Sequence, residues 1–248
     1  MSEITEMKNS SHRHHLKLKF IQTRNDCDGC KEPVFGSCYK CKNRCDYHLH
    51  KECAILDIGS ITHPFFKKSH FTFHESPSGP SQTSSCVACG KKVQGFMYKS
   101  SSNDAHVLHP CCFKLPRNKT TENHEVINLL EKLPFMSKSC LKCGKKNISN
   151  EIKGWAYVSA CGKYRYHVAC VKDMVVENWN NVRFLKETKG RNKSTFEFIV
   201  QQITTVLTGK KARKYRLTII KMIVELIISA IFGDATSIIL TLAGSLQN

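Results

Sequence analysis

The fold is decided by two short segments of the chain, Cys27-Asp28-Gly29-Cys30 and His50-Lys51-Glu52-Cys53. Each segment carries two metal-binding side chains with two residues between them, a gap that lets both donors face one ion. Three cysteines and one histidine form the donor set of a closed structural zinc site, in which a tetrahedral ion holds distant segments together. The two segments therefore predict a small module that is folded around metal.

The same pattern returns twice more along the chain, at intervals of roughly fifty residues. The second quartet is Cys86, Cys89, His109 and Cys112, and the third is Cys140, Cys143, His167 and Cys170. An aromatic–glycine stretch separates the two halves of each quartet, as in Gly95-Phe96 and Gly154-Trp155. Three matches in register indicate a tandem array of zinc modules. Cys111 adjoins Cys112 and is the alternative ligand there, although the repeated spacing favours Cys112.

The first repeat offers a second set of ligands. We group His14, Cys41, Cys45 and His63, because this choice leaves the quartet of Cys27 undisturbed. Cys38 is the alternative to Cys41, and His12 is left as a non-ligand. In the second repeat, Ser100 and Asp104 stand where Cys41 and Cys45 would be, and serine is a poor zinc ligand. We therefore expect one zinc ion per repeat plus a second in the first repeat, about four per chain.

Composition separates the chain into two parts. It has 248 residues with 14 cysteines, 12 histidines and a formal net charge of +18, and no cysteine or histidine follows Cys170. The first fifteen residues contain no apolar stretch resembling a signal peptide. Without export the thiols stay reduced and available to metal, so we expect zinc sites and not disulfides. The same argument predicts an intracellular protein, in the cytoplasm, the nucleus or both.

The first repeat resembles a known family. The order His14, Cys27-x-x-Cys30, Tyr39-x-Cys41 and Cys45-Asp46-Tyr47-His48-Leu49-His50-x-x-Cys53-Ala54 is similar to the divergent C1 domains of plants, relatives of the diacylglycerol-binding C1 module. The resemblance extends over about residues 12–177 and implies small zinc-stabilised α+β modules, with short strands and a short helix, that act in signalling or stress responses without catalysis. The polar stretch before Cys27, Thr23-Arg24-Asn25-Asp26, argues against diacylglycerol binding.

These patterns predict four segments: repeats at 12–65, 66–116 and 122–177, followed by a helical region at 178–248. Apolar periodicity in that region predicts helices over 194–208, 217–232 and 234–243, with a basic run at 210–216. Gly233-Asp234 interrupts the apolar stretch, so each part is shorter than the ~20 residues that a membrane span needs. We expect the helices to pack on each other or on a second copy of the chain. Surface association with anionic lipid through 210–216 is the alternative.

The predicted function is that of a non-enzymatic zinc protein whose modules bind another protein, of unknown identity. One alternative is binding to nucleic acid through phosphate contacts at 210–216 without sequence preference, because the charge is high and no recognition helix lies between the ligands. Another is a peripheral membrane protein. Cys38 and Cys111 are spare thiols, but no further part of a catalytic constellation accompanies them, so no enzymatic activity is predicted.

Overall fold

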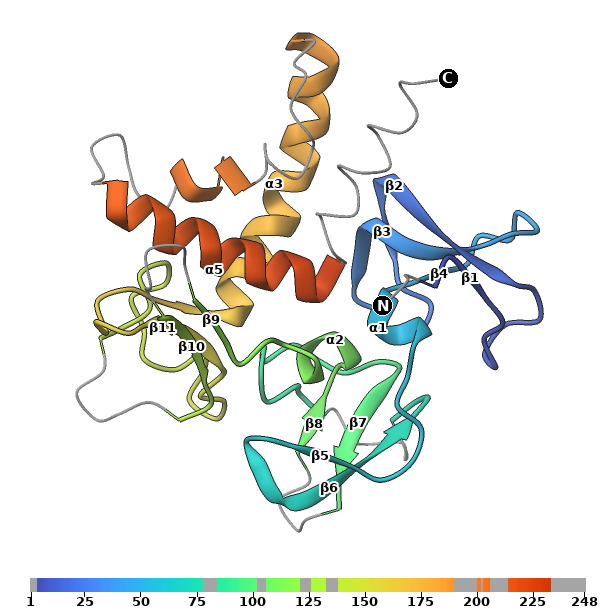
Figure 1. Cartoon of the computed structure of the whole chain (residues 1–248), viewed down its shortest axis with the longest axis horizontal. Helices are drawn as coiled ribbons and strands as arrows, with labels where there is room; N and C mark the ends of the chain where they lie inside the picture. Colours follow the sequence, from blue (N-terminus) through green and yellow to red (C-terminus); the bar gives the residue numbers. More distant parts are fainter. Residues whose placement is uncertain are drawn as a thin grey trace. The chain divides into compact units, whose positions relative to one another are not determined.

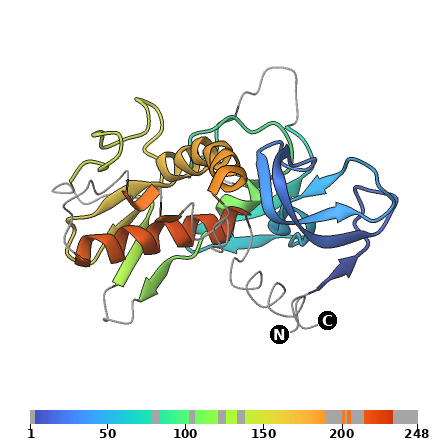
Figure 2. The same ribbon diagram turned by 90° about the horizontal axis from the view of Figure 1, so that it is seen from above.

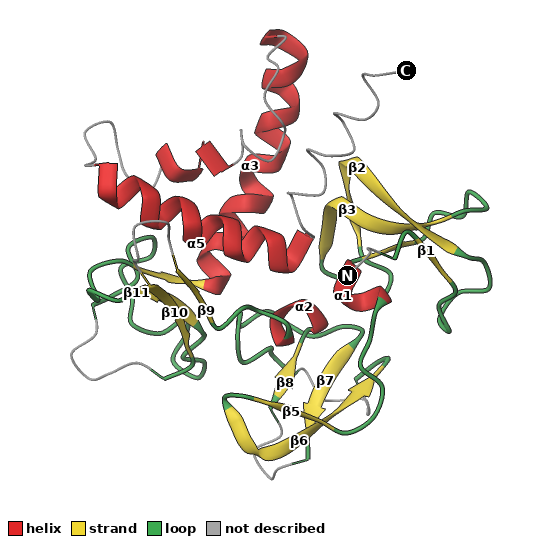
Figure 3. Cartoon of the chain, viewed as in Figure 1, coloured by secondary structure: helices red, strands yellow, loops and turns green. Residues whose placement is uncertain are grey.

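The computed structural model describes the residues given by the following ranges: 4–77, 84–101, 106–120, 126–132, 138–189, 200–201, 203–205 and 214–232. The chain forms two compact units. One contains residues 1–84, 93–114 and 229–248, and the other contains 85–92 and 115–228. Three small antiparallel sheets and several helices make up the described part of the chain, and Figures 1 and 3 show each sheet as a separate set of strands.

The first sheet contains β1 (Glu6–Met7), β2 (Leu16–Asp26), β3 (Pro33–Cys41) and β4 (His48–Leu49) in sequential order, and the short helix α1 (Lys51–Ala54) follows. Its long hairpin pairs Leu16 with Cys41 and Asp26 with Pro33, and its register shifts between Ile21 and Asn25. Leu16 and Tyr39 are fully buried and form part of the module's small apolar core.

The second sheet repeats this order with β5 (Ile61–His63), β6 (Phe66–His74), β7 (Met97–Ser100) and β8 (Val107–Leu108), followed by α2 (Pro110–Phe113). Its core is aromatic: the rings of Phe66 and Phe71 lie 5.4 Å apart, and Phe113 lies 5.5 Å from Phe71. Phe71 pairs with Ser100 as Leu16 pairs with Cys41, so the two modules share a register.

The third sheet belongs to the other unit and contains β9 (Asn118–Thr120), β10 (Val126–Leu130), β11 (Ala156–Ser159) and β12 (Arg165–His167). Ile127 pairs with Ser159 in the same register again. The helix that follows, α3 (Val168–Lys189), has 22 residues, whereas α1 and α2 have four each. The sheet-rich tandem modules predicted from the sequence are thus present, each with a helix directly after its last strand.

The C-terminal helices differ in part from the prediction. The boundary placed between residues 177 and 178 lies inside α3, because this helix begins directly after His167 and continues without interruption. The helix expected at 217–232 is α5 (Lys214–Phe232), the long helix drawn in red in Figure 2. Residues 200, 201 and 203–205 are helical, whereas 194–199 and 234–243 lie outside the described residues.

One face of α5 is polar and the other described side chains are buried. Lys221 and Glu225 form an ion pair of 3.7 Å one turn apart, while Ile220, Ile223 and Ile227 are fully buried. This pattern is typical of a helix that packs against protein. Among the described residues, no helix combines the length and the apolar character needed to cross a bilayer.

Candidate metal centres

The three Cys-x-x-Cys segments, here called knuckles 1, 2 and 3 (residues 27–30, 86–89 and 140–143), share one backbone turn. The amide after the second cysteine donates to the carbonyl of the first, from Lys31 to Cys27 at 2.9 Å, from Gly90 to Cys86 at 2.7 Å and from Gly144 to Cys140 at 2.8 Å. That position has a positive φ of 65°, 69° and 71° respectively. Glycine adopts this conformation readily, whereas a lysine is strained there. This turn places both sulfurs of a knuckle on the same side, where they can bind one ion.

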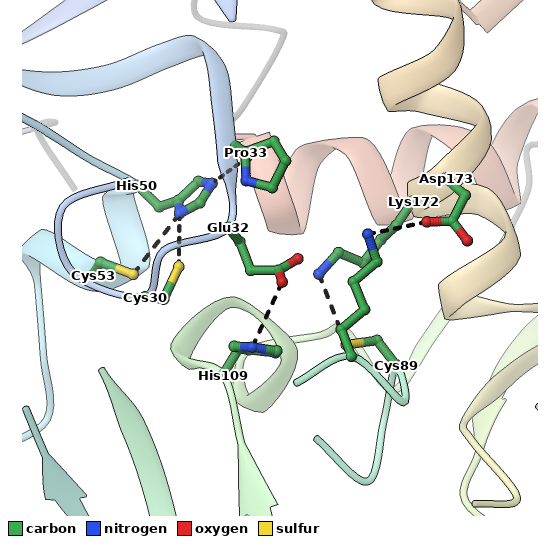
Figure 4. Close-up of polar contacts among 10 residues, drawn as sticks. Cys30, Glu32, Pro33, His50, Cys53, Cys89, His109, Lys172 and Asp173 are labelled. Atoms are coloured by element: carbon green, nitrogen blue, oxygen red, sulfur yellow. Dashed lines mark hydrogen bonds and ion pairs between the residues drawn. The ribbon is translucent and has the colours of Figure 1, made fainter. Parts of the chain in front are cut away.

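The first quartet, Cys27, Cys30, His50 and Cys53, is buried, and its donor atoms all lie within 4.8 Å of one another. Figure 4 shows the His50 ring pointing at the two sulfurs, with Nδ1 at 3.3 Å from Cys30 Sγ and 3.9 Å from Cys53 Sγ. The other ring nitrogen, Nε2, is 2.9 Å from the carbonyl oxygen of Pro33. A hydrogen bond at that nitrogen fixes the ring so that Nδ1 is free to bind metal.

The third quartet is Cys140, Cys143, His167 and Cys170, and it has the same arrangement. His167 Nδ1 lies 3.4 Å from Cys143 Sγ, and Nε2 lies 3.1 Å from the carbonyl oxygen of Lys146. A buried arginine, Arg165, donates to the carbonyls of Lys138 and Lys146 and so closes the loop around the site. His167 is the last residue of β12 and Cys170 lies in the first turn of α3, which explains why the sheet and the helix meet at the metal centre.

The second quartet, Cys86, Cys89, His109 and Cys112, is also buried with its donors within 4.8 Å of one another. The structure therefore selects Cys112, as the repeated spacing favours, while Cys111 Sγ lies 3.9 Å from Glu52 Oε2. Charged groups adjoin two members of the quartet (Figure 4). Glu32 Oε1 is 3.8 Å from His109 Nε2, and the buried Lys172 Nζ is 3.9 Å from Cys89 Sγ.

The fourth cluster corrects the sequence prediction. It consists of His12, His14, Cys41 and Cys45, with all donor atoms within 4.8 Å of one another. His14 Nδ1 lies 3.2 Å from Cys45 Sγ and 3.6 Å from Cys41 Sγ. The predicted ligand His63 is not among these residues, and His12, which was left out, takes its place.

His63 serves the core of the second sheet. It is buried, its ring lies 5.0 Å from that of Phe113 and 5.3 Å from that of Phe65, and its Nδ1 accepts the Phe65 backbone amide. The sequence carries one signal for the correct ligand. His12 stands two residues from His14, in the bend of the chain just before β2, and both rings join the cluster.

The donor sets fit zinc. All four clusters are built from thiols and imidazoles with no carboxylate, the composition of structural zinc sites. His12 Nε2 is buried and has no hydrogen-bond partner in the described part of the chain, so it remains available to a metal ion. Four sets of four donors account for about four zinc ions per chain, as predicted.

In three of the clusters one thiol has a lowered pKa, which favours the thiolate that zinc binds, while hydrogen bonds and burial raise the pKa of a neighbouring ligand thiol, namely Cys53, Cys170 or Cys45. Burial opposes ionisation of Cys30, but hydrogen bonds from Cys27 and Cys53 and the positive field of His50 lower its pKa to about 5. A hydrogen bond from Cys170, together with one from His167, lowers the pKa of Cys140 to about 3. Burial likewise opposes ionisation of Cys41, yet hydrogen bonds, among them one from the Asn43 amide, lower its pKa to about 6.

Comparisons with known proteins agree with this geometry. Residues 10–54 match the family model of the C1 domain, and this range contains both metal clusters of the first sheet. The first repeat is thus similar to a C1 domain of the divergent type, in keeping with the resemblance noted in the sequence. Comparison with curated proteins and with solved structures gave no match.

Proposed function

We propose that the chain is a non-enzymatic zinc protein that acts as an adaptor in intracellular signalling or stress response, and that it binds its partner with knuckle 3. Each metal cluster supplies four protein ligands, which fill a tetrahedral ion, whereas a catalytic zinc ion keeps one position for water or substrate. This complete ligation supports a structural role for the metal. The partner site is inferred from knuckles 1 and 2, because each of them is already covered by a segment of the following repeat.

Knuckle 1 is covered by an aromatic residue from the second repeat. The Phe96 amide donates to the carbonyl of Gly29, the third residue of the knuckle, at 2.9 Å. The approach is close, because a Cβ added to Gly29 would lie 2.5 Å from the Phe96 ring, and one added to Gly95 would lie 2.0 Å from the Gly29 carbonyl oxygen. Glycine at both positions allows the two backbones to meet.

Knuckle 2 is covered in the same way by the third repeat. The Trp155 amide donates to the carbonyl of Ala88, again the third residue of the knuckle, at 2.9 Å. Trp155 follows Gly154 as Phe96 follows Gly95, and both aromatic residues are buried. Two independent contacts at matching positions indicate that a zinc knuckle is a surface for a glycine–aromatic segment.

Knuckle 3 presents the same turn without such a cover. Leu141 is 42% exposed, and Lys142, at the position of Gly29 and Ala88, is exposed where they are buried. Among the described residues no backbone amide donates to the Lys142 carbonyl. The nearby Lys145 and Lys146 are exposed as well. These features support a protein partner that offers an aromatic side chain flanked by acidic residues.

The test compares the proteins that co-purify with the wild type and with Leu141→Asp, quantified by mass spectrometry. The matched control is Ile58→Asp, because Ile58 is 84% exposed and lies in the first unit. We expect a defined set of partners to be lost with Leu141→Asp and kept with Ile58→Asp, while both variants retain their zinc. Equal recovery of every partner by the two variants contradicts the proposal.

The exposed lysines of knuckle 3 also support the phosphate-binding alternative. Lys142, Lys145 and Lys146 lie within five residues and none is buried. Binding to mixed-sequence oligonucleotides that weakens steeply with salt, and that is lost when all three lysines are changed to glutamine, would favour nucleic acid. The same variant tested on anionic vesicles separates a membrane surface from nucleic acid. Much of the run 210–216, the other basic segment, lies outside the described residues.

A further inference from the structure

The three quartets of the repeats differ in how far solvent reaches their cysteines. In the first and second quartets every ligand is buried, and Cys30 and Cys89 are each 1% exposed. In the third quartet Cys143, the second cysteine of knuckle 3, is exposed, and Cys170 is partly buried. Small solutes can therefore reach one Cys-x-x-Cys pair, whereas the other two pairs are enclosed by protein.

The difference follows from what lies against each knuckle. Knuckles 1 and 2 are covered by the segments of Phe96 and Trp155, and knuckle 2 is covered further by a buried lysine, Lys172, whose Nζ lies 3.9 Å from Cys89 Sγ. In knuckle 3 the residues 141–144 are all exposed. Its cysteines thus combine the backbone turn of a zinc knuckle with access to solvent.

Cys143 is placed both to bind metal and to react with the other cysteine of its knuckle. Its Sγ lies 3.4 Å from His167 Nδ1, and all donor atoms of this quartet, including the sulfur of the buried Cys140, lie within 4.8 Å of one another. An accessible thiolate next to a second cysteine is the arrangement of thiols that react with peroxides. The exposed Lys142 and Lys145, close in sequence, add the positive charge that is typical of such sites.

We propose that Cys140 and Cys143 are a redox-sensitive pair, which a hydroperoxide converts to a disulfide with release of the third zinc ion. With hydrogen peroxide, the Cys143 thiolate sulfur attacks one oxygen and becomes a sulfenic acid, and the other oxygen leaves as hydroxide. The Cys140 thiolate then attacks the sulfenic sulfur, forms the S–S bond and displaces a second hydroxide. Two electrons pass from the two thiolates to the peroxide, and two protons from solvent convert both hydroxides to water. Both bonds from the pair to zinc are broken, so the ion leaves as Zn²⁺ with only two protein ligands remaining.

The oxidation would act on the junction between the third sheet and its helix. His167 is the last residue of β12 and Cys170 lies in the first turn of α3, and the ion is what joins both to knuckle 3. Formation of the disulfide would remove that link. The redox pair would operate in this way whether or not knuckle 3 binds a partner.

The experiment titrates the full zinc-loaded chain with hydrogen peroxide until the first ion is lost. Native mass spectrometry counts the ions, and peptide mapping locates the disulfide. The titration is run on the wild type and on Cys161→Ser, because Cys161 is an exposed thiol outside the four clusters. In both we expect a fall from four zinc ions to three with a disulfide between Cys140 and Cys143, while knuckles 1 and 2 stay reduced. Dithiothreitol and added zinc should restore the fourth ion.

Cys143→His is the matched variant, because two cysteines and two histidines also form a tetrahedral zinc site. It should hold four ions before and after the peroxide dose that removes one ion from the wild type, since the accessible sulfur is gone. The comparison of the three knuckles within the wild type does not require this variant to fold. A first disulfide in knuckle 1 or 2 overturns the proposal. A requirement for Cys161 also overturns it, because Cys140 would then not be the thiol that completes the disulfide.

Discussion

At the scale of single residues, the choice of ligands depends on which part of the fold carries the side chain. His12 and His14 both lie in the bend just before β2 and reach the same cluster, and the Tyr47 ring stacks on His12 at a centroid distance of 4.1 Å. His63 is close to Cys53 in sequence, but it belongs to the next sheet and packs among phenylalanines. Sequence order alone did not distinguish these histidines.

The corrected ligand set predicts different outcomes for two histidine substitutions. His12→Ser should lose one zinc ion, because it removes a donor from the partly buried cluster of His12, His14, Cys41 and Cys45. His63→Phe should keep all four ions, since it replaces one ring by another within an aromatic core. Metal content by inductively coupled plasma mass spectrometry measures both. A lost ion in His63→Phe with four ions in His12→Ser would restore the original assignment.

The Cys38 thiol, which belongs to none of the metal clusters, should be unreactive toward alkylating reagents. Burial raises the pKa of Cys38 to about 12, whereas the pKa of a cysteine in an unfolded chain is about 8.5. Alkylation by iodoacetamide should therefore modify the exposed Cys161 at pH 8.5 and leave Cys38 intact in the folded, zinc-loaded protein. Peptide mapping reads out both sites. Equal labelling of the two thiols would show that Cys38 is not buried.

The same raised pKa gives a stability effect of known sign. Between about pH 9 and 12 the unfolded chain has lost this proton and the folded chain has kept it, so the free energy of unfolding falls as pH rises. The slope from this one group is at most about 1.4 kcal/mol per pH unit. Cys38→Ala should flatten the decline in that interval, as measured by denaturant unfolding at fixed zinc. An unchanged slope would contradict the assignment.

At the scale of elements, metal ligands determine where strands end and helices begin. His50, His109 and His167 each stand at the junction between a short strand and a helix, and a cysteine in the first turn of that helix completes the quartet. The ligand spacing predicted these three quartets, and the structure brings each together. It did not predict that α3 would continue for 22 residues, because the sequence change near residue 178 suggested a boundary instead.

The contact between knuckle 1 and the second repeat should tolerate no added side chain. Gly95→Ala places a Cβ 2.0 Å from the Gly29 carbonyl oxygen, so the two backbones must separate. Overpacking of this kind costs about 1–3 kcal/mol. Gln94→Ala is the control, because Gln94 is exposed and adjacent. Thermal unfolding should show a lower midpoint for Gly95→Ala alone, and equal midpoints would mean that this contact is not formed.

The contacts between the knuckles and the glycine–aromatic segments could not be predicted from the sequence. The aromatic–glycine stretches were visible between the halves of each quartet, but their targets were not. The Phe96 amide meets the Gly29 carbonyl only once the knuckle has formed its turn and Gly29 lacks a side chain. Phe96 and Gly29 are 67 positions apart, and their contact depends on the backbone conformation at both places. Such a contact leaves no periodic signal in the sequence.

At the scale of the whole molecule, metal takes the place of a large apolar core. Each sheet has four strands, several of only two to four residues, and modules of this size bury too little apolar surface to fold unaided. Zinc binding supplies the missing free energy in such domains. The second and third repeats keep one quartet each, and the first keeps two, so the loss of one ion should affect its own repeat most.

The most direct test of this account is the removal of zinc from the intact chain. Native mass spectrometry should find four zinc ions before chelation, and exhaustive dialysis against a strong chelator under reducing conditions should abolish the β-sheet signal in circular dichroism. Adding back four equivalents of zinc should restore it. A chain that keeps its sheet spectrum after all metal is removed would contradict the central claim that metal folds the three modules.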